Sequence, residues 1–229
     1  MNEQEAMWKG PFGNDYNERN QRSDMVASNM ALFAKVLERT SKLKSIVEFG
    51  CGTGQNLQAL DALISWDCEV YGVEINEDAA MRCPVGNILR GSMFDVKVPE
   101  VCELVFTKGF LIHVAPDRLE DAFSIIANAS SRYVMFAEYH SPRIESLNYR
   151  GQDNRLWKGP YAEMFIQEYP CYELIYTTFV SKLDKFPQDD LTVFLMRNVY
   201  EQHTPFFQKK IRDVLHNLSV ADYAVGMQL

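Results

Sequence analysis

The most informative segment of the chain is Ile46-Val47-Glu48-Phe49-Gly50-Cys51-Gly52-Thr53-Gly54. A short apolar run ends in three glycines that are separated by single residues, and the segment 55–62 that follows has helical composition. Glycine allows positive φ and lets a ligand approach the backbone closely. A strand, a glycine-rich turn and a helix in this order are typical of a nucleotide-type ligand site at the carboxyl end of a strand. The spacing is G-x-G-x-G, which differs from the G-x-G-x-x-G of the dinucleotide fingerprint and disfavours a dinucleotide-dependent oxidoreductase.

Length and composition favour a single α/β domain. The 229 residues are enough for one substantial domain and short for two. A hydrophobic fraction of 47% supports a packed core. The formal net charge is -8 and no run of Lys or Arg occurs, so we expect no nucleic-acid partner.

The cysteines carry no metal or disulfide pattern. They are scattered without C-x-x-C spacing, at Cys51, Cys68, Cys83, Cys102 and Cys171. Their odd number fits a reducing compartment. Because the sequence shows neither a signal-peptide pattern nor an apolar run of membrane-spanning length, we expect a cytoplasmic protein with no membrane partner.

Apolar periodicity predicts alternating strands and helices. Strands are expected at 45–49, 69–76, 87–93, 103–113 with the strand exit included, 133–139, 172–176 and 191–196. Helices are expected at 23–40, 55–65, from Pro116 onward, and at 159–168. This order predicts a Rossmann-like, seven-stranded, mostly parallel sheet with an antiparallel last strand and helices on both faces. The polar segment 140–158 is expected to be a long functional loop.

The chain divides into three parts. Residues 1–22 are polar but contain Trp8, Phe12 and Tyr16, and we expect this segment to cover a bound ligand rather than to form a flexible tail. Residues 23–197 form the α/β domain. Residues 198–229 are amphipathic, and we expect a helical extension that is a candidate surface for homodimer formation.

Glu74 ends the second predicted strand, 20 residues after Gly54. A carboxylate at this position can accept hydrogen bonds from both hydroxyls of a ribose, as it does in dinucleotide folds. The alternative is a solvent-exposed strand end.

The segment Glu48–Gly54 resembles the first motif of the class I S-adenosylmethionine (SAM) methyltransferases. Further stretches at 13–20, 107–113, 137–139, 149–151 and 186–192 resemble the pseudaminic acid biosynthesis-associated methylases, over roughly residues 8–197. Similar proteins include azetidine-2-carboxylate synthases, which cyclise SAM. In that family an Asn commonly precedes the proline after Glu-Tyr, whereas this chain has Tyr139-His140-Ser141-Pro142.

The resemblance implies a set of cofactor contacts. Backbone at Gly50, Cys51 and Gly52 would face the methionine moiety and ribose of SAM, and Glu74 would bind the ribose. The adenine would lie against Ile75, Ser92 and Met93, with Ser92 where an Asp is common. The remaining cofactor candidates are Trp8, Phe12, Tyr16, Arg19, Glu48, Asn56, Lys108, Gly109 and His113.

Several of these candidates have a stated role. The rings of Trp8, Phe12 and Tyr16 would cover the sulfonium by cation–π contact, or else pack as ordinary core. Arg19 offers bidentate geometry to the methionyl carboxylate, or is a solvated helix-end charge. The methionyl ammonium would approach Glu48 and the carbonyls of 108–109.

Acceptor groups are expected after the last strands, where Tyr139, His140 and Asp189 are the catalytic candidates. Glu138 and Asp190 lie beside them in the sequence. Paired acids at 189–190 suit an ammonium or simply solvate a turn. Three basic residues of the 140–158 segment suit a phosphate or carboxylate, or form surface salt bridges: Arg150, Arg155 and Lys158.

These features predict a SAM-dependent methyltransferase that acts on a small polar acceptor, such as a sugar, amino-sugar or amino acid derivative. Because the sulfonium carries the reactivity, no catalytic triad and no metal are expected. Two alternatives remain open: a SAM cyclase or lyase on the same fold, which would release methylthioadenosine, and a non-catalytic SAM-binding protein.

Overall fold

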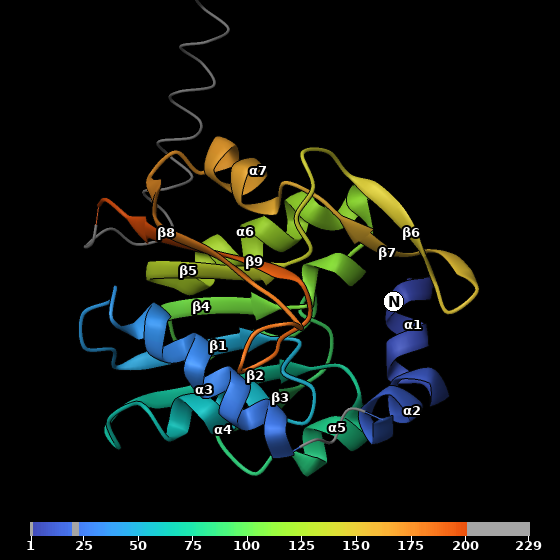
Figure 1. Ribbon diagram of the computed structural model, residues 1–229, viewed down its shortest axis with the longest axis horizontal. Coiled ribbons are helices and arrows are strands. Elements are labelled where there is room, and N and C mark those ends of the chain that lie inside the picture. Colours follow the sequence, from blue (N-terminus) through green and yellow to red (C-terminus); the bar gives the residue numbers. More distant parts are fainter. Residues whose placement is uncertain (1, 20–22, 201–229) are drawn as a thin grey trace, which may run out of the picture.

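The computed structural model describes residues 2–19 and 23–200. Its centre is a seven-stranded sheet in the order β3-β2-β1-β4-β5-β9-β8 (Figure 1). The strands are β1 Ser45–Phe49, β2 Glu69–Glu74, β3 Asn87–Arg90, β4 Cys102–Lys108, β5 Ser130–Glu138, β8 Tyr172–Val180 and β9 Leu191–Asn198. Strands β1 to β5 are parallel where they pair, and β9 runs antiparallel to both β5 and β8. The predicted fold class is therefore confirmed, with the antiparallel strand one place inside the sheet edge.

Helices cover both faces of this sheet because the strands bury side chains on both sides. Val47 and Phe49 of β1 belong to one apolar cluster, and Ile46 belongs to the other. The first cluster also holds α6 (Leu119–Ala129) and α7 (Tyr161–Glu168), whereas the second holds α3 (Ser23–Leu37) and α4 (Gln55–Asp61). Shorter elements at the carboxyl ends of the strands are α5 (Glu77–Arg82) and the 3₁₀ turns η1 (Leu111–His113) and η2 (Pro116–Arg118).

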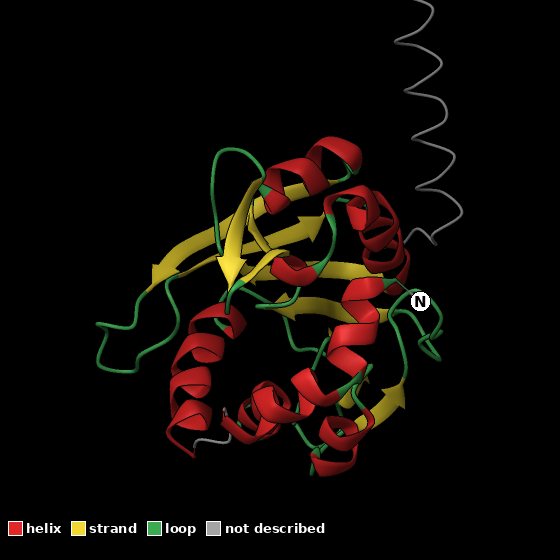
Figure 2. Ribbon diagram, turned by 90° about the vertical axis from the view of Figure 1, so that its right-hand side faces the viewer, coloured by secondary structure: helices red, strands yellow, loops and turns green. Residues whose placement is uncertain are grey.

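The N-terminal segment forms two short helices, α1 (Glu3–Lys9) and α2 (Pro11–Arg19). Helix α1 begins with a capping box, in which Asn2 Oδ1 accepts from Glu5 N at 2.9 Å and Glu5 Oε2 accepts from Asn2 N at 2.7 Å. Figure 1 shows both helices on the side toward which the β4 arrow points, which is the side of the sheet where a ligand binds in such folds. Figure 2 views the molecule from this side.

The prediction of a long loop at 140–158 is wrong for residues 145–158. Most of it is an antiparallel hairpin of β6 (Glu145–Tyr149) and β7 (Gln152–Lys158). Arg150 and Gly151 make the turn with φ of 53° and 79°. The buried side chains of Leu156 and Trp157 anchor the hairpin, but the polar residues around them hid the strand pattern.

Other boundaries differ by a few residues. Helix α4 ends at Asp61 rather than at 65, and β8 continues to Val180. The predicted helical extension and the homodimer through it lie almost wholly outside the described residues, which end at Tyr200.

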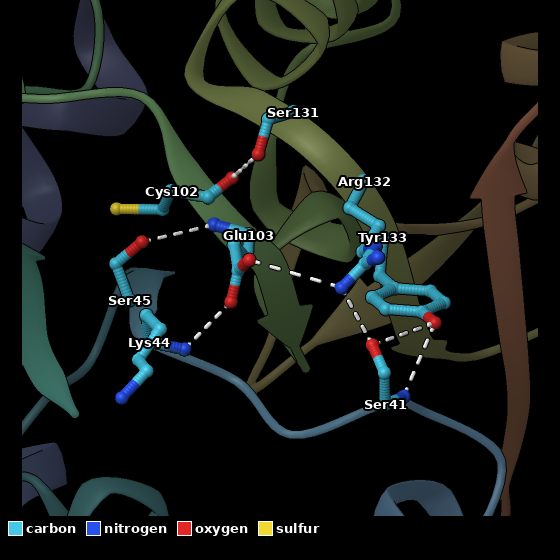
Figure 3. A network of polar contacts seen from close by, with 8 residues as sticks. All are labelled: Ser41, Lys44, Ser45, Cys102, Glu103, Ser131, Arg132 and Tyr133. Carbon is cyan, nitrogen blue, oxygen red and sulfur yellow. Dashed lines mark hydrogen bonds and ion pairs between the residues drawn. The ribbon is translucent and has the colours of Figure 1, made fainter. Parts of the chain in front are cut away.

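Polar groups at the amino ends of the central strands bind one another (Figure 3). Glu103 Oε2 accepts from Lys44 N at 2.6 Å, and Ser45 Oγ accepts from Glu103 N at 3.1 Å. Arg132 Nη1 donates to Ser41 Oγ at 2.6 Å and lies 3.8 Å from Glu103 Oε1. This network connects β1, β4 and β5 at the end of the sheet away from the glycine-rich turn.

Candidate functional site

A cavity of about 510 Å³ lies at the carboxyl ends of the parallel strands. Its wall comes from the glycine-rich turn, the exits of β2, β3 and β4, the two N-terminal helices and the hairpin. Most of the residues predicted for the site line it, namely Trp8, Tyr16, Gly50, Cys51, Gly52, Asn56, Glu74, Ile75, Ser92, Met93, Lys108, Gly109, His113, Tyr139 and Asp189.

Four predicted residues do not line the cavity. Phe12 packs edge-on against Trp8, and Arg19 is exposed at the end of α2. Glu48 is fully buried beneath the wall. The His140 ring lies 2.9 Å from Glu163 Oε1 and packs against Phe194.

The glycine-rich turn combines tight packing with one open position. Gly50, Gly52 and Gly54 have φ of 74°, 54° and 78°. A Cβ at Gly54 would lie 2.1 Å from Cys83 Sγ, whereas a Cβ at Gly52 would meet nothing within 4 Å. Gly54 is thus needed for packing, and the backbone at Gly52 is left open to an approaching ligand.

Glu74 joins this turn to the end of β2. Its carboxylate accepts from Gly52 N at 2.8 Å and from Asn76 N at 2.7 Å. Burial raises the pKa of Glu74. Each carboxylate oxygen has a further lone pair, so Glu74 can still accept hydrogen bonds from a ligand in the cavity.

Beneath the cavity floor, Glu48 Oε1 accepts from Asn56 Nδ2 at 2.5 Å. Glu48 Oε2 and Asn56 Oδ1 are buried without a hydrogen-bond partner in the described part of the chain. Burial raises the pKa of Glu48 to about 8 and lowers the pKa of Lys108. This corner of the cavity therefore holds polar groups that the protein alone does not satisfy.

Asn76, which is not among the predicted site residues, holds the N-terminal helices over the cavity. Its Nδ2 donates to Trp8 O at 3.0 Å and to Asn14 Oδ1 at 2.8 Å, while its Oδ1 accepts from Asn17 Nδ2 at 3.2 Å. The same Oδ1 caps α5 by accepting from Ala79 N. Its position as the helix cap after Glu74 was the one signal available in the sequence.

Helix α1 also contacts the segment after β3 on one side and strand β7 of the hairpin on the other. Ser92 Oγ donates to Glu5 Oε1, which places a carboxylate from α1 beside the predicted adenine position. Gln4 Nε2 donates to Asn154 O at 2.9 Å, and Arg155 Nη2 lies 3.0 Å from Glu3 Oε2. The helices α1 and α2 thus form a cover over the cavity, and Arg155 helps to hold this cover in place. These residues were not predicted to meet, since their pairing depends on the unforeseen hairpin.

Aromatic rings gather under this cover. The Trp8 ring centroid lies 5.1 Å from that of Tyr16 and 4.6 Å from that of His113, and His113 lies 5.3 Å from Tyr149. The indole Nε1 of Trp8 is buried without a partner among the described residues. Tyr149, which was not assigned a role from the sequence, completes the group from the hairpin.

His113 is held as a neutral imidazole. Its Nδ1 lies 3.0 Å from Arg155 O, and because a carbonyl only accepts, Nδ1 carries the proton. Burial lowers the pKa of His113 to about 4. The other ring nitrogen, Nε2, is left unprotonated.

The acceptor candidates separate into two groups. Tyr139 and Asp189 line the cavity, and burial followed by the charge of Asp189 raises the pKa of Tyr139 to about 12. Asp190 instead accepts from Ser181 Oγ at 2.9 Å and lies 3.3 Å from Lys182 Nζ, outside the cavity wall. Lys158 pairs with Glu145 at 3.3 Å.

Glu138 has a structural position at the end of β5. Its carboxylate accepts from the backbone N–H of Phe110 and of Leu111, both at 3.2 Å, and so holds the turn that carries His113. Burial raises its pKa to about 7.

Within the described residues, no three His, Cys, Asp or Glu side chains are grouped so that they could hold a metal ion. No helix in the same part of the chain has the length and apolar character needed to cross a membrane.

Comparison with known proteins agrees with this geometry. Residues 47–130 match a family model described as a methyltransferase domain. No curated protein matches the sequence. Among solved structures, the chain resembles magnesium protoporphyrin IX methyltransferase from Synechocystis with bound S-adenosylhomocysteine, at TM-score 0.58 and 14% identity over 85% of this chain and 97% of that one.

Two further structures show the same fold. A sugar N-methyltransferase from Streptoalloteichus matches at TM-score 0.56 and 16% identity, over 83% of this chain and 93% of that one. A SAM-dependent methyltransferase from Clostridium acetobutylicum matches at TM-score 0.56 and 10% identity, over 81% and 97%.

The domain match over residues 47–130 and the shared fold show that the chain is similar to SAM-dependent methyltransferases and has their Rossmann-like fold. The similar structure from Synechocystis holds S-adenosylhomocysteine, and the open backbone at Gly52 beside the Glu74 carboxylate would fit the nucleoside of such a ligand.

Proposed function

We propose that the protein transfers the methyl group of SAM to a small polar acceptor that carries an amine or a hydroxyl. The observation that supports this most directly is the Glu74–Gly52 hydrogen bond at the cavity wall, beside the open backbone of the glycine-rich turn. Glu74 would bind the ribose hydroxyls, and Ile75, Ser92 and Met93 would contact the adenine.

The N-terminal cover would exclude water from the reacting groups. The faces of Trp8 and Tyr16 would lie against the positive sulfonium, a contact worth about 0.5–2 kcal/mol. Phe12 would support them from behind, since it packs on Trp8 and, at 5.9 Å, on Tyr149. SAM supplies an activated methyl group, so the protein's task is to position the acceptor in line with it.

The acceptor would enter from the side of Tyr139 and Asp189. The acceptor's lone pair forms the new bond to the methyl carbon as the carbon–sulfur bond breaks, and its proton passes to Asp189 or solvent. Three phenol groups, Tyr16, Tyr139 and Tyr149, line the cavity together with Asp189, which suits a cationic or neutral amine better than an anion. His140 bonds to Glu163 away from this wall, so the proposal rests on Tyr139 and Asp189.

A second candidate function is cyclisation of SAM by its own amine. It is favoured by the aromatic cover, which surrounds the cavity from α1 to the hairpin. In that reaction the amino group attacks within SAM and methylthioadenosine leaves.

Analysis of the nucleoside product separates these functions. The protein is incubated with SAM, with and without a small-molecule extract containing amines and amino sugars, and the products are identified by mass spectrometry. Methyl transfer predicts S-adenosylhomocysteine that appears only with the extract and is lost in the Glu74→Ala variant. Methylthioadenosine from SAM alone would contradict methyl transfer and support cyclisation.

A further inference from the structure

The outermost strand of the sheet, β8, carries exposed apolar side chains. Leu174 is 46% exposed and Phe179 is 60% exposed. In the part of the chain that the structure describes, β8 pairs only with β9, so its other edge has no strand partner there. The strand sequence Tyr172–Val180 contains no lysine and no proline, the residues that commonly protect an exposed edge. Apolar groups beside such an edge mark a surface on which another segment can pack.

A β-bulge places these two side chains on the same face of the sheet. Leu174 lies opposite Met196 of β9, and the register shifts between Leu174 and Tyr176. Phe179 lies opposite Thr192, which is four positions from Met196 on β9. Because side chains alternate between the faces of a strand, this even separation on β9 defines a common face. In a strand without a bulge, the odd separation of Leu174 and Phe179 would place them on opposite faces.

This face is the one that α6 and α7 cover over the neighbouring strands. Met196 belongs to the apolar cluster of these helices, and Phe194 of β9 packs against that cluster but is only partly buried. Leu174, Phe179 and Phe194 therefore form an apolar strip on the outer part of the face, where side chains remain accessible. Four steps of an extended strand give this strip a length of about 13 Å.

The chain beyond the described residues begins at one end of the strip. Asn198, the last residue of β9, lies opposite Tyr172, the first residue of β8. Leu174 follows Tyr172 after one residue on β8. Tyr200 is the last described residue and is exposed. Residues 201–229 therefore start at the Leu174 end of the strip.

The sequence of 201–229 contains an apolar pattern that matches the strip. Four apolar residues recur at the three- or four-residue spacing typical of one face of a helix, namely Phe207, Ile211, Leu215 and Leu218. The positions between them carry charges, at Lys209, Lys210, Arg212 and Asp213. A helix from 207 to 218 would be about 17 Å long, which is close to the length of the strip. An apolar helix face of this kind needs a surface to pack on.

We propose that residues 201–229 dock on the apolar strip of their own chain, with the apolar face of 207–218 against β8 and β9. The segment begins at one end of the strip, has the length needed to cross it, and carries apolar groups that would otherwise stay in water. The short connection from Tyr200 holds the segment close to the strip, which favours docking within one chain over docking between chains. This contact requires neither SAM nor an acceptor.

Photocross-linking of the full-length protein tests this contact. p-Benzoylphenylalanine is placed at the position of Phe179 or, as a matched control, of Glu173, which is exposed but precedes Leu174 directly and so lies on the opposite face. After irradiation, peptide mass spectrometry should find position 179 joined to peptides of 201–229. The yield from position 173 should be at least about fivefold lower, because that side chain points away from the strip. Mixing unlabelled and ¹⁵N-labelled protein separates links within one chain from links between copies.

Substitutions in the segment complete the test. Leu215→Asp puts a charge into the apolar face and should lower the yield from position 179 by at least about fivefold. Arg212→Ser, on the charged side, should change that yield by less than about twofold. Links between copies would overturn docking within one chain and assign the strip to a second molecule. The absence of links to 201–229, equal yields from both positions, or no effect of Leu215→Asp would each overturn the proposal.

Discussion

The two ends of the central sheet differ in whether their polar groups have hydrogen-bond partners within the protein. At the amino end, Glu103, Lys44, Arg132 and Ser41 bond to one another across three strands (Figure 3). At the carboxyl end, Trp8 Nε1, Glu48 Oε2 and Asn56 Oδ1 are buried without partners in the described residues. In the first region the polar groups bind one another, as in a structural network. In the second region buried polar groups lack partners, as expected of a site where a ligand supplies the missing hydrogen bonds.

This difference predicts opposite consequences for mutation. Losing a group from the closed network removes bonds that exist only in the folded protein, so stability falls and ligand affinity does not change. Losing a group that a ligand completes lowers affinity with a smaller effect on the free protein. Substitutions at the two ends of the sheet test that separation.

The largest effect is expected for Glu74→Ala. Removing the carboxylate would take away charge-assisted hydrogen bonds to the ribose, a loss of roughly 1.5–3 kcal/mol or more in binding free energy. Calorimetric titration with SAM should then show at least a tenfold weaker affinity in a variant whose circular dichroism is that of the wild type. Unchanged affinity in the folded variant would remove Glu74 from the ribose site.

The next effect is expected for Gly13→Ala in the cover. A Cβ at this position would lie 1.9 Å from Trp8 O and 2.8 Å from Asn76 Nδ2, so α1, α2 and Asn76 could not keep their present contacts. We expect faster trypsin cleavage at Lys9 and about three- to tenfold weaker SAM binding. Asp15→Ala, on the exposed side of the same helix, is the matched control.

Ligand should have the reverse effect on the wild-type segment. Cleavage at residues 8–20 should slow when S-adenosylhomocysteine is added, because the cover then packs on the ligand as well as on the protein. Equal cleavage with and without ligand would show that the two helices do not close on the cofactor.

A smaller effect, on stability alone, is expected for Glu103→Gln. The neutral amide loses the charge that attracts Lys44 N and Arg132, and the free energy of unfolding should fall by about 1 kcal/mol. Denaturant unfolding measures this change, and SAM affinity should stay at the wild-type value. A loss of affinity would mean that the two ends of the sheet are coupled.

The smallest effect concerns pH. Folding lowers the pKa of His113 from 6.5 to about 4. Between these pH values His113 binds a proton in the unfolded chain but not in the folded protein, so the free energy of unfolding falls as the pH falls through this range. Glu138, with its pKa raised to about 7, opposes this because its contribution is lost as pH rises from about 4.5 to 7. Glu138 acts equally in the wild type and in His113→Phe, so the difference between the two proteins reports on His113. When the pH is lowered from 6.5 to 5, the free energy of unfolding should fall more for the wild type than for His113→Phe. An equal decrease would contradict the neutral buried imidazole.

Much of the fold was predictable because the strands of a parallel sheet are apolar runs that end in distinctive residues. Gly50 to Gly54 fixed the first turn, and the spacing to Glu74 placed the second carboxyl end correctly. The hairpin at 145–158 was missed because Asn148, Arg150 and Asp153 interrupt its apolar alternation.

The site was predictable where a residue belongs to a strand end and less so where tertiary contacts place it. Glu74, Lys108 and Tyr139 follow strands, and all three line the cavity. His140 also follows a strand, but its ring turns to Glu163, a partner that periodicity does not show. Asn76 acts through three contacts with the N-terminal helices, and no local pattern identifies such long-range bonds.

The most direct test of the contrast between the two ends of the sheet is a crystal structure of the protein with S-adenosylhomocysteine. We expect the ribose hydroxyls within hydrogen-bond distance of the Glu74 carboxylate, the homocysteine part directed toward Gly50–Gly52 and Lys108, and α1 and α2 closed over the ligand. The network around Glu103 should be unchanged. A ligand bound elsewhere, or bound with its ribose away from Glu74, would contradict the account.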